Sequence, residues 1–196
     1  MDWRLYHAIY GVSLHHHWVG TLFHAIETVS IPFMVIVTVA LWLFARPGGS
    51  RKWKLAATTA LGSAALALAV NRAIASLIWH RDRPYQTHTI AHPWSSSHDA
   101  SFPSDHSSAS FAIAFAVLMF DPLAGALFLL AALVIGVGRL FIGAHYPGDV
   151  AAGVLVGFAA AIVVTKLLRP VIAALVRLAE RLTDPILGRL WRLSSK

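Results

Sequence analysis

Residues 107–138 read SSASFAIAFAVLMFDPLAGALFLLAALVIGVG and contain one charged residue, Asp121. Asp121 divides the stretch into two charge-free segments, 107–120 and 122–138. A helix that crosses the ~30 Å hydrocarbon core of a bilayer needs about 20 apolar residues. The two segments therefore predict two adjacent membrane helices joined by a short turn, and the first reaches that length only if residues 104–110 form its first turns.

The composition of the whole chain also indicates a membrane protein. Of its 196 residues, 57% are hydrophobic and 13% are charged, against about 25% charged in soluble domains, and the mean hydropathy is +0.65. Together with three further apolar stretches we predict five spans, with a sixth left open, at 24–45, 55–79, 104–120, 122–142 and 147–168. The predicted fold class is an all-α polytopic membrane helix bundle, built as a single domain over residues 1–196.

The basic residues predict the orientation, because Lys and Arg are retained on the cytoplasmic side of a membrane. They gather between the first two spans and after the fifth: Arg46, Arg51, Lys52 and Lys54, then Lys166, Arg169, Arg177, Arg181, Arg189, Arg192 and Lys196. With five spans, residues 80–106 and 139–149 then face outward together with the N-terminus. We expect residues 2–20 to form an interfacial helix, and residues 170–193 to form a basic amphipathic helix on the inner face or docked on the bundle.

Composition also narrows the chemistry. The formal charge of +7 suits anionic lipids or phosphate-bearing substrates, while the apolar content argues against nucleic acid. The absence of Cys excludes a disulfide framework, a thiolate nucleophile and a Cys-ligated metal. Consecutive His15, His16 and His17 do not share a helix face, so no metal or cofactor is expected. The start, Asp2–Trp3–Arg4, does not resemble a signal peptide, and no cleaved segment is expected.

Three polar clusters lie on the predicted outer side: residues 81–84 (RDRP), 102–106 (FPSDH) and 139–149 (RLFIGAHYPGD). Ionisable groups within a bilayer are costly and usually paired or functional. Arginines on separate segments can grip several phosphoryl oxygens at once. Ser104 can cap a helix whose backbone N–H groups then face an anion. The clusters therefore predict a phosphate pocket.

The histidines in these clusters suit phosphoryl transfer. His145 and Asp149 are four residues apart, so the carboxylate can accept a hydrogen bond from one ring nitrogen and leave the other with an exposed lone pair. This arrangement describes an oriented nucleophile or base. His106, on another segment, can protonate a leaving oxygen. The structural alternative is that both histidines are ordinary interfacial residues.

Together, Arg83–Pro84, Pro103–Ser104–Asp105–His106 and the spacing Arg139–x3–Gly143–x–His145–x3–Asp149 resemble the three-part signature of the type-2 phosphatidic acid phosphatase superfamily of membrane lipid phosphatases. The resemblance implies metal-independent hydrolysis in two steps. It implies that His145 attacks phosphorus to give a phosphohistidine, Asp149 orients it, and His106 protonates the departing oxygen. It assigns phosphoryl binding to Arg83, Arg139 and Ser104, and structural roles to Pro84, Pro103 and Gly143.

Two positions depart from the family pattern. Ser76 stands where the family has a Lys, and our hypothesis is that Arg72 or Arg81 supplies the missing phosphate-binding cation. Asp105 stands where the family commonly has Gly, and a carboxylate beside phosphate must be turned outward or paired with Arg81 or Arg139. We count all four of these positions, 72, 76, 81 and 105, as candidates for the phosphate site.

The FPSDH variant, together with Asn71 and the Arg81–x–Arg83–Pro84 form, is similar to the undecaprenyl-diphosphate phosphatase branch. The resemblance implies conversion of undecaprenyl diphosphate to undecaprenyl phosphate, which recycles the carrier lipid for peptidoglycan synthesis at a bacterial inner membrane. Alternatives are a phosphatase for phosphatidic acid, phosphatidylglycerophosphate or another lipid phosphate, a metal-dependent enzyme, and a non-catalytic lipid-phosphate binder or translocator. The expected partners are a lipid substrate and the bilayer, and the oligomeric state stays open.

Overall fold

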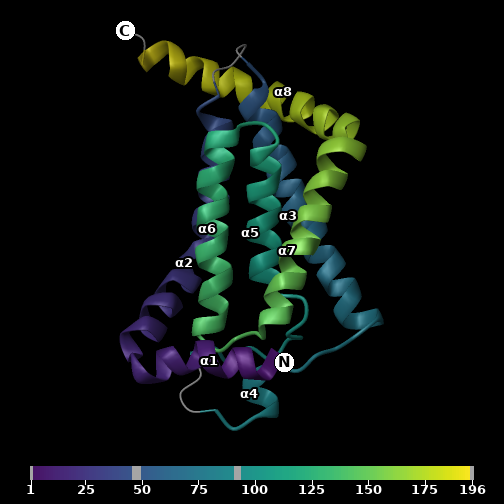
Figure 1. The fold of residues 1–196 in the computed structure, drawn as a ribbon. Coiled ribbons are helices and arrows are strands. Elements are labelled where there is room, and N and C mark those ends of the chain that lie inside the picture. The colour runs from purple at the N-terminus through teal and green to yellow at the C-terminus, as the bar shows by residue number, and fades with distance from the viewer. Residues whose placement is uncertain (1, 46–49, 91–93, 195–196) are drawn as a thin grey trace.

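The computed structural model describes residues 2–45, 50–90 and 94–194, with side chains up to residue 188. Within these ranges the chain is helical and contains no strand (Figure 1). The elements are α1 (Asp2–His15), α2 (His17–Leu43), α3 (Lys52–Leu77), α4 (Pro84–Thr87), α5 (Asp105–Leu118), α6 (Pro122–Phe141), α7 (Pro147–Ile162), a π-helical turn η1 (Val163–Leu167) and α8 (Arg169–Ser194). The predicted all-α polytopic bundle is confirmed.

Four described helices are long and apolar enough to cross a membrane: α2, α3, α6, and α7 continued through η1. The remaining predicted span, 104–120, is the 14-residue α5. At 1.5 Å per residue α5 is about 21 Å long, shorter than the ~30 Å core. It makes its most extensive contacts with α7, α6 and α3. Other helices, rather than lipid, therefore surround most of α5.

Small residues let α5 and α7 approach closely. A Cβ added at Gly157 of α7 would lie 2.7 Å from the Ser108 carbonyl oxygen, and one at Gly153 would lie 2.8 Å from the Ser104 carbonyl oxygen. Small residues at such positions allow helix backbones to come together. This contact holds the N-terminal turn of α5 against the middle of α7.

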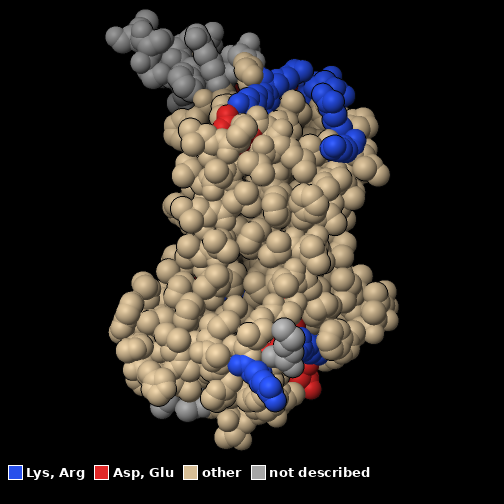
Figure 2. All heavy atoms as spheres, in the orientation of Figure 1, with Lys and Arg blue, Asp and Glu red and all other residues tan. Residues whose placement is uncertain are grey.

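The two ends of the bundle differ. All three polar clusters lie at the end crossed by α1, and α8 lies at the opposite end (Figure 1). Figure 2 shows charged residues gathered at these two ends, with an uncharged band between them. The expected N-terminal helix is two helices separated at His16, so that α1 runs across the end of the bundle before α2 enters it.

Ion pairs attach α8 to the start of α3. Arg51 contacts Glu180 at 2.7 Å and Lys54 contacts Asp184 at 2.7 Å. A third ion pair, between Lys52 and Asp121 at 2.6 Å, joins α3 to the start of α6. The apolar face of α8 packs through Ile172 and Val176 against Val164. The helix predicted over 170–193 is thus docked on the bundle through its first half. Arg46, Lys196 and the side chains of Arg189 and Arg192 lie outside the described residues.

Candidate active site

His145 lies between α6 and α7 and is 1% exposed. Its Nδ1 is 2.8 Å from the carbonyl oxygen of Ser101. Because a carbonyl oxygen only accepts hydrogen bonds, Nδ1 carries the proton and donates it. The neutral ring therefore has its lone pair on Nε2, which fixes the tautomer that a nucleophile requires.

Two guanidinium groups flank this lone pair. Arg83 Nη1 and Arg139 Nη2 each lie 3.3 Å from His145 Nε2, and the two arginines are 4% and 3% exposed. Arg83 immediately precedes α4, and Arg139 lies in the last turn of α6. A phosphoryl group in front of Nε2 would therefore meet cations from two separate segments.

Further contacts fix both arginines. Arg83 donates from Nε to the Asp99 carbonyl oxygen at 3.1 Å and from Nη2 to the Asp99 carboxylate at 3.0 Å. Arg139 forms an ion pair with Glu27 of α2. Neither Asp99 nor Glu27 belongs to a motif, and no spacing in the sequence distinguishes them from other acidic residues.

Asp149 in the first turn of α7 is fully buried. Its Oδ2 accepts hydrogen bonds from Ser101 Oγ at 2.6 Å and from the Tyr146 N–H at 2.9 Å, whereas His145 Nδ1 is 3.7 Å away. The sequence predicts a direct hydrogen bond between the carboxylate and the imidazole. The structure instead places Ser101 between them. The Ser101 carbonyl oxygen accepts a hydrogen bond from the imidazole, and the Ser101 hydroxyl donates one to the carboxylate.

Arg81 is engaged by carboxylates. It contacts Asp149 Oδ1 at 2.7 Å and Asp2 of α1 at 2.8 Å, and its guanidinium lies 3.9 Å from the centre of the Tyr146 ring. Asp2 also accepts a hydrogen bond from the Gly148 N–H at 2.9 Å. Arg81 therefore holds the Asp149 carboxylate in place by an ion pair, and its contact with Asp2 links α1 to the site.

The other residues proposed for the missing cation are placed differently. Arg72 is exposed and lines a cavity of about 170 Å³ together with Pro103 and Asp105. Ser76 is exposed and its hydroxyl donates to the Arg72 carbonyl oxygen at 2.8 Å. Asp105 is exposed and accepts from Asn71 Nδ2 at 2.7 Å; neither Arg81 nor Arg139 is its partner. The structure thus brings Arg72, but not Ser76, to the cavity beside Asp105.

Ser104 joins the second cluster to the third. It is the N-cap of α5, its hydroxyl accepts from the Ser107 N–H, and its own N–H donates to the Asp149 carbonyl oxygen at 3.1 Å. His106, in the first turn of α5, lines a cavity of about 370 Å³ with Glu27 and Trp94. Because Glu27 pairs with Arg139, this cavity adjoins the arginines around His145.

The motif residues expected to be structural sit at turns. Gly143 has φ +74°, a conformation that L side chains rarely adopt, and an added Cβ would lie 2.8 Å from the Tyr10 ring. Pro84 is the first residue of α4, and Pro103 is buried in the segment that leads to Ser104. These backbone features place the neighbouring side chains, Arg83, Ser104 and His145.

The pKa of His145 is lowered from 6.5 to about 3, mainly by burial and to a smaller extent by the charges of Arg139 and Arg83, while Asp149 opposes the shift. His145 is therefore neutral at physiological pH, which is the form with a free lone pair. Residues 2–45, 50–90 and 94–194 hold no group of three His, Asp or Glu side chains suited to a metal ion. Hydrolysis without a metal ion stays a prediction.

A comparison with known protein families matches the region that contains these residues. The profile of the PAP2 superfamily matches residues 53–172, which include all three clusters. The chain belongs to this superfamily. The predicted enzyme class, a lipid phosphatase, is thereby confirmed at the level of the family. The roles assigned to individual residues stay predictions.

Proteins similar to this chain include the undecaprenyl-diphosphatase BcrC of Bacillus subtilis, 29% identical over 95% of each chain. The bacitracin transport permease protein BcrC of Bacillus licheniformis is 46% identical over 34% of this chain and 32% of its own. The crystal structure of Aquifex aeolicus LpxE matches with a TM-score of 0.65 and 22% identity, over 83% of this chain and 93% of that one. This last likeness supports the fold alone.

Proposed function

We propose that this PAP2 protein hydrolyses undecaprenyl diphosphate to undecaprenyl phosphate and phosphate, without a metal, through a phosphohistidine on His145. The observation that carries the proposal is the imidazole whose Nδ1 donates to the Ser101 carbonyl at 2.8 Å while Nε2 faces Arg83 and Arg139 at 3.3 Å. A nucleophile with a fixed tautomer and cations beside its lone pair matches the needs of phosphoryl transfer.

In the first step, His145 Nε2 attacks the terminal phosphorus and the bond from phosphorus to the bridging oxygen breaks. Protonated His106 gives its proton to that oxygen, and undecaprenyl phosphate leaves. Arg83 and Arg139 balance the charge on the equatorial phosphoryl oxygens. The imidazole becomes cationic, and its Nδ1 proton stays hydrogen-bonded to the Ser101 carbonyl oxygen. Buried Asp149, 3.7 Å away, stabilises the positive charge.

In the second step, a water molecule attacks the phosphohistidine. Neutral His106 accepts the proton of this water, the bond between phosphorus and Nε2 breaks, and phosphate is released. Both histidines return to their starting protonation states. The cavity beside His106 and Glu27, about 370 Å³, provides room for the water and the leaving group.

The choice of lipid rests on the FPSDH variant, the Arg81–x–Arg83–Pro84 form and the similarity to undecaprenyl-diphosphatase BcrC over 95% of the chain. A polyprenyl tail can stay among the apolar helices while its diphosphate reaches the end where the clusters meet. We further propose that this end faces outward from a bacterial inner membrane and that α8 is cytoplasmic, because the basic residues concentrate at the α8 end.

The test is phosphate release from undecaprenyl diphosphate by purified protein in EDTA, with His145→Ala and, as a control, His98→Ala, an exposed residue of the loop before α5. We expect wild type and His98→Ala to be active and His145→Ala to be inactive. Loss of activity in EDTA, restored by a divalent ion, would overturn the metal-free mechanism. A wild-type preference for phosphatidic acid or phosphatidylglycerophosphate would overturn the substrate, and no hydrolysis of any of these lipids would favour a binder or translocator.

A further inference from the structure

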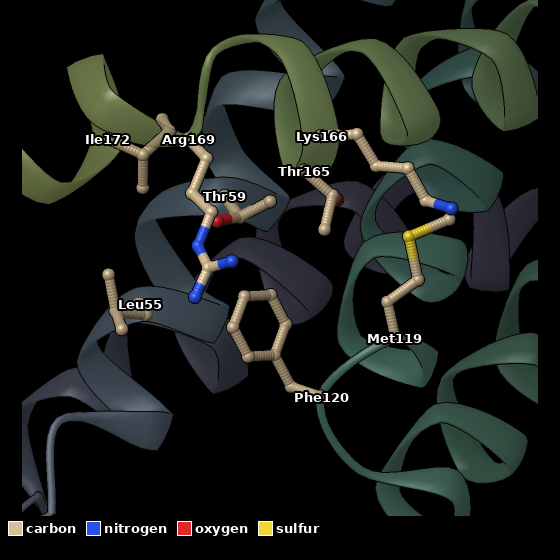
Figure 3. A pocket seen from close by; sticks show the side chains of 8 residues that line it. All are labelled: Leu55, Thr59, Met119, Phe120, Thr165, Lys166, Arg169 and Ile172. Carbon is tan, nitrogen blue, oxygen red and sulfur yellow. The ribbon is translucent and has the colours of Figure 1, made fainter.

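A pocket of about 650 Å³ lies at the opposite end of the bundle from the proposed active site. Figure 3 shows it between α3, the residues that follow α5, η1 and the start of α8. Leu55, Phe120 and Ile172 contribute apolar walls, and Lys166 and Arg169 contribute two cations. No catalytic step uses these residues.

The two cations differ from the basic residues at the start of α3. Arg51, Lys52 and Lys54 are neutralised by the acidic side chains that attach α3 to α8 and α6. Lys166 and Arg169 are exposed and have no acidic partner in the part of the chain that the structure describes. The pocket therefore carries two uncompensated positive charges at the end of an apolar bundle.

Thr165 supplies a second, independent observation. Its hydroxyl oxygen is buried and has no hydrogen-bond partner among the described residues, and its side chain points into the pocket between the two cations (Figure 3). Buried hydroxyls are normally hydrogen-bonded, because leaving one unpaired costs free energy. Thr165 also lies in η1, and π-helical turns are frequent at functional sites.

We propose that this pocket binds an anionic phospholipid of the leaflet that surrounds the α8 end. The lipid phosphate lies between Lys166 and Arg169, and the Thr165 side chain turns so that its hydroxyl donates a hydrogen bond to that phosphate. One acyl chain follows the apolar wall formed by Leu55, Phe120 and Ile172. A free phosphate ion shares the headgroup chemistry. The apolar wall and the position at the end of the spans favour the lipid, because an ion would leave that wall uncovered.

The experiment measures the thermal unfolding midpoint and the dissociation constant in detergent at about 0.15 M salt, where exposed charges are largely screened beyond ~8 Å. The probes are dioctanoyl phosphatidylglycerol, dioctanoyl phosphatidylcholine and inorganic phosphate. A ligand that binds only the folded protein raises the unfolding midpoint. We expect a rise with phosphatidylglycerol and a much smaller one with the other two probes.

Lys166→Gln and Arg169→Gln should each weaken phosphatidylglycerol binding about fivefold, since one cation near a lipid headgroup contributes about that factor. Thr165→Val keeps the shape of the side chain, removes the hydroxyl and should weaken binding by a similar factor. The matched control is Arg177→Gln, which removes an exposed charge of α8 outside the pocket and should change binding less than twofold. Unchanged hydrolysis of undecaprenyl diphosphate by all four variants, in detergent without added phospholipid, shows that they are folded.

Three results would overturn the proposal. An equal effect of Arg177→Gln would mean that general surface charge attracts the lipid. An equal rise with inorganic phosphate would mean that the site takes the free ion. Undiminished phosphatidylglycerol binding in the Lys166→Gln/Arg169→Gln double variant would place the lipid elsewhere, including at the proposed active site.

Discussion

At the scale of single residues, the backbone carbonyl of Ser101 and its side-chain hydroxyl contact different residues of the site. The carbonyl oxygen fixes the proton on His145 Nδ1, and the hydroxyl satisfies Asp149 at 2.6 Å. A third contact, from the Ser101 N–H to the Arg81 carbonyl oxygen at 2.7 Å, holds the backbone of Ser101 itself in place. Ser101 is therefore a positioning residue that acts through both members of the predicted His–Asp pair.

Replacing Ser101 by Ala should lower kcat about tenfold and leave KM nearly unchanged. The change keeps the carbonyl contact to His145 but leaves one hydrogen bond of a buried carboxylate unmade, which costs roughly 1.5–3 kcal/mol. Steady-state hydrolysis of undecaprenyl diphosphate measures the effect. Ser97→Ala, in the same loop, is the control and should behave as wild type. A rise in KM with unchanged kcat would contradict the positioning role.

The depressed pKa of His145, about 3, predicts a pH dependence of stability. In the unfolded chain the imidazole titrates near 6.5, so below that pH the unfolded state binds a proton that the folded state does not. The contribution of neutral His145 to stability is complete above pH ~6.5 and declines as the pH falls toward the folded pKa. Relative to His145→Gln, wild type should lose about 2 kcal/mol between pH ~7.5 and ~5.

Unfolding in detergent, followed at these two pH values for both proteins, checks this prediction. The His145→Gln variant is the control for wild type, because the two proteins share every other titrating group. An unchanged difference in the free energy of unfolding would show that His145 titrates normally in the folded protein.

At the scale of elements, the site depends on the contact of α5 with α7 and on the position of α1. Ser104 at the start of α5 bonds the Asp149 carbonyl at the start of α7, so a shift between these helices separates two of the clusters. α1 closes the same end: Tyr6 stacks on Tyr10 with ring centres 5.5 Å apart and contacts Tyr146 at 5.7 Å. Asp2 then reaches Arg81 from this helix.

Gly157→Ala should lower the unfolding midpoint and the activity together. The added Cβ would lie 2.7 Å from the Ser108 carbonyl oxygen and 2.8 Å from the Ala112 nitrogen, and overpacking of this kind costs typically 1–3 kcal/mol. Gly62→Ala in α3 is the matched control, since its Cβ would meet Ile172 and Val164 at an ordinary 3.5 Å and Ala favours a helix over Gly. Thermal unfolding in detergent compares the two, and equal midpoints would contradict the close contact of α5 with α7.

At the scale of the whole molecule, the two ends carry different chemistry. One end holds the buried residues Arg83, Arg139 and His145 of the proposed active site, and the other holds α8 and the uncompensated cations of the proposed lipid pocket. The uncharged band in Figure 2 separates them. A substrate and a bound phospholipid would thus approach from opposite leaflets.

The chain contains no Cys, so single Cys variants report the orientation without background. Ser96→Cys lies in the exposed loop at the proposed active-site end, and Ser50→Cys lies at the α8 end before α3. A membrane-impermeant maleimide added to intact spheroplasts should label Ser96→Cys at once and Ser50→Cys only after permeabilisation. The reverse pattern would place the proposed active site in the cytoplasm.

The sequence predicted the helical class and the gathering of the clusters at one end for a simple reason. Both depend on local properties: the length of charge-free stretches sets the helices, and the parity of their number sets which loops share an end. The N-cap at Ser104 is equally local, since it depends on residues next to it in the chain. The structural role of Gly143 was implied by the family motif, and the structure shows its positive φ.

The tertiary structure alone decided which side chains touch. Four residues reach the site from three segments: Asp99 and Ser101 from the loop before α5, Glu27 from α2, and Asp2 from α1. Neither composition nor spacing marks them, because such residues become partners only when distant backbones meet. The same reason explains why the sequence placed Asp149 directly on His145, and why it left open whether Arg72 or Arg81 replaces the missing Lys. Hydrophobic pattern places helices in a membrane, whereas the contacts between them depend on shape and on polar pairs that no single stretch contains.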